Sequence, residues 1–216
     1  MDFTLWDILR NLLLAARWTI LLSIAAFVGG GIVGILILLA RISRRKRLAR
    51  AAGIYIATFQ GTPLLMQLFL VFFGLPMLGF RIEAWTAAVL ALTLYASAFL
   101  AEIWRGGVEA IPDGQWDAAA SLGLHPLAQL RLIVLPQAFA ITRAPIVGFL
   151  VQLVKSTALT SIIGFDELMK TSNAINNATF QPFTVYGFVA LIYFALCFPL
   201  TRYAKLLEQR TATARR

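Results

Sequence analysis

The chain has 216 residues, of which 60% are hydrophobic and 13% are charged, and its mean hydropathy is +0.80. Soluble domains average about half apolar and about a quarter charged residues, so this composition excludes an ordinary soluble enzyme and predicts an integral membrane protein. The net charge of +9 does not indicate a nucleic-acid partner, because the basic residues cluster beside apolar runs without a nucleic-acid motif. Cys197 is the single cysteine, which can form neither an internal disulfide nor a metal cluster.

The first 17 residues predict an interfacial amphipathic helix. They mix acidic and basic residues with apolar ones, unlike the basic-then-apolar order of a cleavable signal peptide. Trp6 suits the headgroup level of a membrane. The apolar face at helical spacing consists of Leu5, Ile8, Leu9, Leu12 and Leu13.

Five apolar runs are long enough to cross the hydrocarbon core, which needs about 20 residues. We therefore predict an all-α integral membrane protein in which residues 1–216 form one domain with five transmembrane helices and the N-terminal interfacial helix. In the first span, Gly30 and Gly34 have the GxxxG spacing that lets helices approach closely. The predicted spans are residues 18–40, 53–75, 84–104, 137–163 and 184–206.

The distribution of Lys and Arg predicts the orientation, because cytoplasmic loops are enriched in both. Residues 41–50 are strongly basic, and the segment after the fifth span is basic too. Both are expected to be cytoplasmic, which places the N-terminus outside and residues 105–136 inside. The basic residues of the C-terminal segment are Lys205, Arg210, Arg215 and Arg216.

The second span is interrupted by Gln60, Gly61, Thr62 and Pro63. Proline removes a backbone donor and clashes with the preceding turn. The carbonyls that it frees need protein partners or a water-lined cavity. The break therefore favours a position that faces a transport pathway, and an ordinary proline kink in a packed helix is the alternative.

Near the inner end of the third span, Glu102 and Arg105 are three residues apart and can pair on one helix face. Charged residues inside spans are costly and are therefore candidates for function. The pair is either a structural ion pair or part of a gate.

The fourth span is rich in polar side chains, including Gln152, Lys155, Ser156 and Thr157. The first three share one helix face with Leu159. An ammonium group that faces lipid is expensive, so Lys155 is expected to face a cavity or a partner. The face either lines a pathway opposite the break at residues 61–63 or holds the bundle together. Lys155 is expected to attract a carboxylate of the substrate or to pair with Glu102.

Residues 105–136 break the apolar sequence without resembling a disordered linker. Pro112, Asp113 and Gly114 predict a turn. A helix over residues 115–122 is expected next.

This helix has an anion, Asp117, in its first turn and Gly123 just past its end. Pro126 and Pro136 suit the first positions of a second short helix and of the next span. Two short surface helices are therefore expected between two spans. On the other side of the membrane, Asp166 is expected to cap a short helix that runs to about Ile175.

The segments DAAASLG, residues 117–123, and IVLP, residues 133–136, resemble the EAA loop of the membrane subunits of binding-protein-dependent ABC importers. The resemblance implies that the loop docks into a cleft of a separate ATPase subunit. A loop that merely connects two spans is the alternative. The residues that the resemblance assigns to coupling are Gly114, Asp117, Ala118, Ala119, Gly123, Leu135 and Pro136.

The likeness extends over nearly the whole chain and narrows to the polar amino-acid subfamily, whose members import histidine, glutamine, arginine or glutamate. It rests on segments such as QGTPLLMQLFLVFFGLP at residues 60–76, SAFLAEIWRG at 97–106 and KSTALTSIIG at 155–164. It implies the ABC type I importer permease fold and a multi-pass location in the bacterial cytoplasmic (inner) membrane. It also implies transport by alternating access.

The resemblance further implies several partners: two ATPase subunits, a second permease subunit in a homo- or heterodimer, and an extracytoplasmic substrate-binding protein. The chain itself is expected to contact the lipid bilayer and no nucleic acid. No segment matches the phosphate-binding pattern GxxxxGK[ST]. We therefore expect no enzymatic activity and no cofactor in this chain, with ATP and Mg²⁺ bound by the partner ATPase.

The chain departs from its relatives at four positions. Gln60 stands where many have Arg, Asp117 where Glu is usual, Gly148 where Asn is common, and Ser156 where Asp is frequent. Asp117 keeps the charge, so coupling should survive. Ser156 offers only a hydroxyl, which argues against a substrate held by a carboxylate at that position.

Three alternatives remain. A permease of the same type could carry amino-acid derivatives such as opines, ectoine or cystine. A stand-alone channel or secondary transporter is less favoured, because the spans lack Asp and a clear inverted repeat. The third is a non-transporting membrane anchor.

Overall fold

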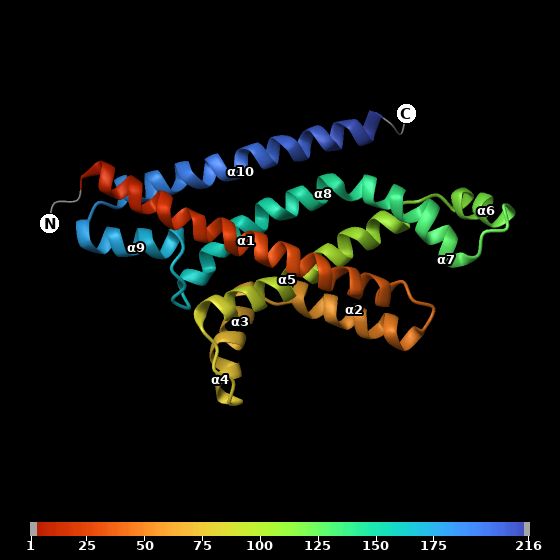
Figure 1. Cartoon of the computed structure of the whole chain (residues 1–216), viewed down its shortest axis with the longest axis horizontal. Helices are drawn as coiled ribbons and strands as arrows, with labels where there is room; N and C mark the ends of the chain where they lie inside the picture. Colours follow the sequence, from red (N-terminus) through yellow and green to blue (C-terminus); the bar gives the residue numbers. More distant parts are fainter. Residues whose placement is uncertain (1–3, 214–216) are drawn as a thin grey trace.

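The computed structural model describes residues 4–213, and within that range every regular element is a helix. The long helices α1, α8 and α10 run roughly along the longest dimension of the molecule (Figure 1). Arg215 and Arg216, which entered the predictions above, lie outside the described residues. Four helices are long and apolar enough to cross a membrane, or five when one bent pair counts as a single span.

Helix α1 (Leu5–Arg41) is continuous, so the predicted interfacial helix and first span form one element. The sequence contains no breaker between them, and a capping box between Thr4 and Asp7 starts the helix. Ile8 and Leu12 are fully buried, in a cluster with apolar residues of α9 and α10. The separate interfacial helix was therefore a wrong prediction, because the helix is continuous and Ile8 and Leu12 of its apolar face pack on protein, whereas Leu5 and Leu13 are exposed.

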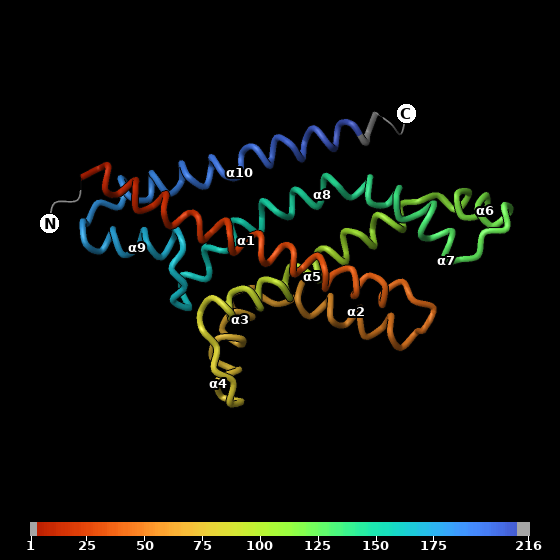
Figure 2. The backbone as a smooth tube through the Cα atoms, in the orientation of Figure 1, coloured from red at the N-terminus to blue at the C-terminus, as the bar shows by residue number. Residues whose placement is uncertain are grey.

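The predicted break in the second span is confirmed. Helix α2 (Lys46–Gly61) ends before Pro63, and the chain continues through α3 (Leu64–Phe69), the π-helical turn η1 (Leu70–Gly74) and α4 (Leu75–Met77). The two halves are bent by 105°. Figure 2 shows this arm turning away from the other helices.

Helix α5 (Ala84–Glu109) is the central element and packs closely on α1. A β-carbon at Gly30 would lie 2.5 Å from the Ala96 β-carbon, and one at Gly34 would lie 3.0 Å from the Ser97 carbonyl oxygen. The close approach predicted from the GxxxG spacing is therefore confirmed.

Helix α6 (Asp113–Ser121) forms the first short helix of the loop. The second predicted short helix is not separate. Helix α7 (Pro126–Ala128), the π-helical turn η2 (Gln129–Val134), α8 (Leu135–Ser156) and the 3₁₀ turn η3 (Thr157–Ser161) follow one another without a gap. Pro126 does begin a helix, whereas Pro136 lies inside this continuous element, because the π-helical turn before it accommodates the ring.

The chain ends with α9 (Leu168–Thr179) and α10 (Pro182–Thr213). Glu167, and not the predicted Asp166, caps α9, since its side chain accepts a hydrogen bond from the Lys170 backbone N–H at 2.9 Å. Asp166 instead forms an ion pair with the Lys170 ammonium at 2.9 Å. Phe180, in the left-handed region at φ 53°, ends the helix.

Candidate functional site

The loop predicted to couple to an ATPase projects from one end of the molecule, where α6 lies beyond the ends of the other helices (Figure 1). Its two roots are held together, because a β-carbon at Gly107 of α5 would come within 3.0 Å of the Ala138 carbonyl oxygen of α8. Val108, Ile111, Val134 and Ala138 form a small buried cluster under the loop. The loop is therefore fixed to the transmembrane helices that it connects.

The end of α6 has the geometry predicted for Gly123. Its φ is +72°, and its N–H donates to the Ala120 carbonyl at 2.9 Å while the Leu124 N–H donates to the Ala119 carbonyl at 3.2 Å. Positive φ strains any residue with a β-carbon. The helix begins at Asp113, two residues earlier than predicted, so Gly114 lies in its first turn and not in a turn before it.

Most of the predicted coupling residues are accessible. Ala119 is buried against the loop's base, and Leu135 is half-buried. The exposed members are Gly114, Asp117, Ala118, Gly123 and Pro136.

Two apolar side chains at the tip of the loop were missed by the sequence reasoning. Leu122 is 79% exposed and Leu127 is 68% exposed, on either side of Gly123. The sequence did offer a signal for them, because both are leucines in a segment predicted to lie outside the membrane. Exposed leucines on such a projection are typical of a protein–protein contact.

The predicted pair between Glu102 and Arg105 is present on α5. The Arg105 Nε donates to a Glu102 carboxylate oxygen at 2.9 Å, and Arg105 also pairs with Glu109 one turn further on. Lys155 is not a partner of Glu102, because both pairings described for Glu102 involve Arg105. This ladder along one helix favours the structural interpretation of the pair.

The polar face of α8 divides into two parts. The Gln152 amide donates to the Tyr95 hydroxyl at 3.1 Å, which links α8 to α5. Thr157 is fully buried, and its hydroxyl donates to the Val154 carbonyl at 2.8 Å. Thr157 is therefore satisfied within its own helix and does not line an open pathway.

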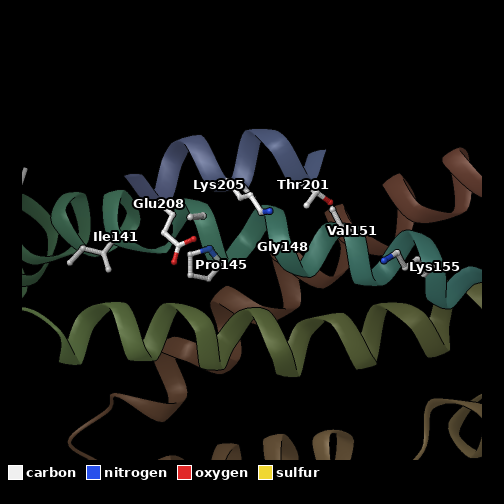
Figure 3. A pocket seen from close by; sticks show the side chains of 10 residues that line it. Ile141, Pro145, Gly148, Val151, Lys155, Thr201, Lys205 and Glu208 are labelled. Carbon is white, nitrogen blue, oxygen red and sulfur yellow. The ribbon is translucent and has the colours of Figure 1, made fainter. Parts of the chain in front are cut away.

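Lys155 is exposed and lies at one end of a groove of about 660 Å³ between α8 and α10. Figure 3 shows Lys155 separated along α8 from Pro145, near which Lys205 and Glu208 of α10 lie. Gly148 and Val151 line the α8 side between these two ends. The groove thus runs from the Lys155 ammonium toward the charged side chains of Lys205 and Glu208 on α10.

The break at residues 60–63 is exposed and none of its four residues lines this groove. Helices α2 and α3 lie on the opposite side of the molecule from α10 (Figure 1). The structure therefore does not bring the break and the Lys155 face together around this groove within one chain.

Gln67 satisfies backbone carbonyls at the break, and the sequence reasoning missed this residue too. Its amide donates to the Phe59 carbonyl at 2.9 Å and to the Thr62 carbonyl at 3.1 Å. Phe59 is four residues before Pro63, so its carbonyl is the one that the proline leaves without a donor. Because Gln67 supplies that donor, the break does not require a water-filled cavity. An amide side chain one turn after a proline was the available signal.

Taken together, the fold and these sites define a polytopic membrane permease with a helical loop projecting from one end. The chain belongs to the family of binding-protein-dependent transport system inner membrane components, whose family model matches residues 30–213.

Comparisons with individual proteins agree with this assignment. The chain is 35% identical over 195 residues to the probable amino-acid ABC transporter permease protein YckA of Bacillus subtilis, which covers 90% of this chain and 86% of that protein. It is 36% identical over 193 residues to the arginine transport system permease protein ArtQ of Bacillus subtilis, covering 89% of this chain and 88% of that protein.

Among solved structures, the chain resembles the crystal structure of an amino acid ABC transporter with histidines, with a TM-score of 0.89 and 32% identity over 97% of this chain and 100% of that one. It also has the fold of an inward-facing MetNI methionine ABC transporter chain, with a TM-score of 0.72 and 21% identity over 94% of this chain and 96% of that one.

Proposed function

We propose that this chain is the transmembrane permease subunit of an ATP-driven, binding-protein-dependent importer of polar amino acids. Its similarity to amino-acid permeases over nearly its full length supports the transport class. The same comparisons favour a permease subunit of an ABC importer over a stand-alone channel or secondary transporter. Amino-acid derivatives remain the second substrate class, since one relative at 32% identity is an L-cystine transport system permease protein.

In this proposal the chain works in the bacterial inner membrane with two ATPase subunits, a second permease subunit and an extracytoplasmic binding protein. The ATPase subunits bind ATP and Mg²⁺, and hydrolysis is theirs. Residues 105–136 carry their motion into α5 and α8, to which the loop is directly fixed. The polar face with Gln152, Lys155 and Ser156 then lines the pathway.

The exposed apolar tip of the loop carries this proposal, because the leucine side chains of Leu122 and Leu127 are 79% and 68% exposed. Burial of a leucine side chain contributes about 1.5–3 kcal/mol. The double variant Leu122→Ser/Leu127→Ser should therefore insert normally but no longer co-purify with the ATPase subunits. Leu78→Ser, at a leucine that is 73% exposed outside the loop, is the control. Normal co-purification of the double variant would reject the docking role.

A further inference from the structure

The turn between α1 and α2 carries a dense positive charge. Six of the ten residues from 41 to 50 are Lys or Arg, and no Asp or Glu lies among them. Within residues 4–213 the ion pairs involve only Arg105 and Lys170 as cations, so the basic side chains of the turn form no ion pair there. Its exposed basic side chains are Arg44, Arg45, Lys46, Arg47 and Arg50.

The polarity of α2 adds to this charge. The helix begins at Lys46 without a side-chain cap at Arg45 and without an acidic residue in its first turn. A helix N-terminus carries a partial positive charge and is stabilised by anions. The turn therefore combines positive charges that an external anion would neutralise. The basic side chains without an ion pair are the main reason for expecting such an anion.

The surface of the turn also has apolar parts. Arg45, Lys46 and Arg47 border an open hollow of about 590 Å³ together with Leu48 and Ala51. Leu48 is 45% exposed. A ligand with an anionic head and an apolar tail matches this lining better than a simple inorganic ion.

The position of the turn matches the surface of the membrane. Both α1 and α2 run back from it into the bundle, and α6 projects further in the same direction (Figure 2). The turn thus lies between the membrane-spanning helices and the projecting loop, at the level of the lipid headgroups. Clusters of four to eight Lys or Arg residues next to a span attract anionic lipids, with each residue contributing about 1 kcal/mol.

We propose that the turn at residues 41–50 is a binding site for the phosphate headgroups of anionic phospholipids in the inner leaflet. The site is separate from the transport pathway. It depends on the proposed orientation but not on the identity of the substrate, so a wrong substrate class would leave it intact.

The test is native mass spectrometry of the purified complex, with its ATPase subunits, titrated with phosphatidylglycerol or phosphatidylcholine. Wild-type complex should retain phosphatidylglycerol preferentially, and raised salt should weaken binding. Arg45→Gln/Arg47→Gln should weaken the apparent affinity roughly twentyfold. Arg45→Lys/Arg47→Lys keeps both charges and should retain most of the affinity for phosphatidylglycerol. This variant therefore separates an effect of lost charge from an effect of misfolding. The control is Arg10→Gln/Arg81→Gln, at two exposed arginines outside the turn.

Three results would overturn the proposal. Equal retention of both lipids would show that charge does not select the ligand. An equal loss in the control variant would place the lipid elsewhere. Displacement of phosphatidylglycerol by inorganic phosphate would assign the turn to soluble anions.

Discussion

Glu167 is a fully buried carboxyl group at the N-cap of α9. It accepts hydrogen bonds from the Lys170 N–H at 2.9 Å and from the Thr19 hydroxyl of α1 at 3.3 Å, and the Tyr193 hydroxyl of α10 lies at 3.5 Å. Burial raises the pKa of Glu167 above its ordinary value of 4.5, against the opposing effect of these donors. The Glu167 carboxyl group therefore links α9, α1 and α10, and it ionises less readily than an exposed glutamate.

This raised pKa predicts a pH dependence of stability. The folded state binds the proton more tightly than the unfolded state, so stability falls as pH rises from about 4.5 through the raised pKa and is then constant. Glu167→Gln should remove this part of the pH dependence, with a change of a few degrees in melting temperature. Thermal unfolding of the purified subunit between about pH 5 and about pH 8 measures it. Glu83→Gln, at an exposed carboxylate, is the control, and an unchanged profile in Glu167→Gln would contradict the prediction.

Lys155 is the residue on which the pathway hypothesis depends most directly. It is exposed in the groove between α8 and α10, so its ammonium has access to a substrate or to a partner subunit. Lys155→Met keeps the volume and removes the charge. A pathway role predicts a loss of uptake of at least tenfold, equivalent to about 1.4 kcal/mol, with normal assembly.

Lys205→Met is the matched control, because Lys205 is a second lysine that lines the same groove, from α10. Uptake by reconstituted vesicles and the amount of assembled complex are measured together. Poor assembly of Lys155→Met would support a role in holding the bundle together. Normal uptake at normal abundance would remove Lys155 from the pathway.

At the scale of elements, the broken second span is stabilised by a side chain from within the same arm. Gln67 is 6% exposed and supplies donors to the carbonyls released around Pro63. Gln67→Leu leaves those carbonyls unsatisfied and should destabilise the purified protein by about 1–3 kcal/mol. Gln60→Leu changes an exposed glutamine beside the same break and should have little effect. Equal melting temperatures for the two variants would show that the break is satisfied in another way.

Helix α6 depends on its exit at Gly123. The position has φ +72° and open space around it, so Gly123→Ala tests backbone strain alone, whereas Gly123→Leu also fills the surface beside Leu122 and Leu127. A β-carbon at positive φ costs of order 1–2 kcal/mol. We expect ATP hydrolysis stimulated by the binding protein to fall moderately in the first variant and strongly in the second.

The control is Gly187→Leu, at an exposed glycine of α10 with open space around it. Membrane insertion should be normal in all three variants. If Gly123→Leu supported full stimulated hydrolysis, the assignment of this loop as the coupling element would fail.

Local chemistry explains which elements could be predicted from the sequence. Pro63, Gly123 and the pair of glycines at 30 and 34 each impose a constraint that acts within a few residues, and all three constraints appear in the structure. The burial of Ile8 and Leu12 against protein could not be predicted, because their partners lie on helices more than 150 residues away along the chain.

The same reason applies to the candidate sites. Gln67 and Glu167 act through partners that the sequence does not reveal, namely carbonyls freed by a bend and hydroxyls of two distant helices. Pro136 lies in the first two positions of α8 as predicted, but the π-helical turn that joins α8 to α7 without a gap was not predicted. The role of the Lys155 face remains a prediction, since its surroundings in an assembled complex involve other chains.

At the scale of the whole molecule, the charge distribution predicts one orientation in the membrane. The basic turn at residues 41–50 and the projecting loop with α6 lie toward one end, whereas α9 lies at the other (Figure 1). Because cytoplasmic loops are enriched in Lys and Arg, we predict that the first end lies inside the cell and α9 outside. Helices α1 and α10 then have their N-terminal ends outside.

Single cysteines test this orientation in a Cys197→Ser background. Asn177→Cys and Arg47→Cys place thiols at two exposed positions at opposite ends of the molecule, on α9 and on the basic turn. A membrane-impermeant thiol reagent should label Asn177→Cys in intact cells and Arg47→Cys only after the membrane is opened. Labelling of both in opened membranes confirms that each thiol is accessible. The reverse pattern in intact cells would invert the orientation, and the proposed lipid site and the docking of α6 on a cytoplasmic ATPase would fail with it.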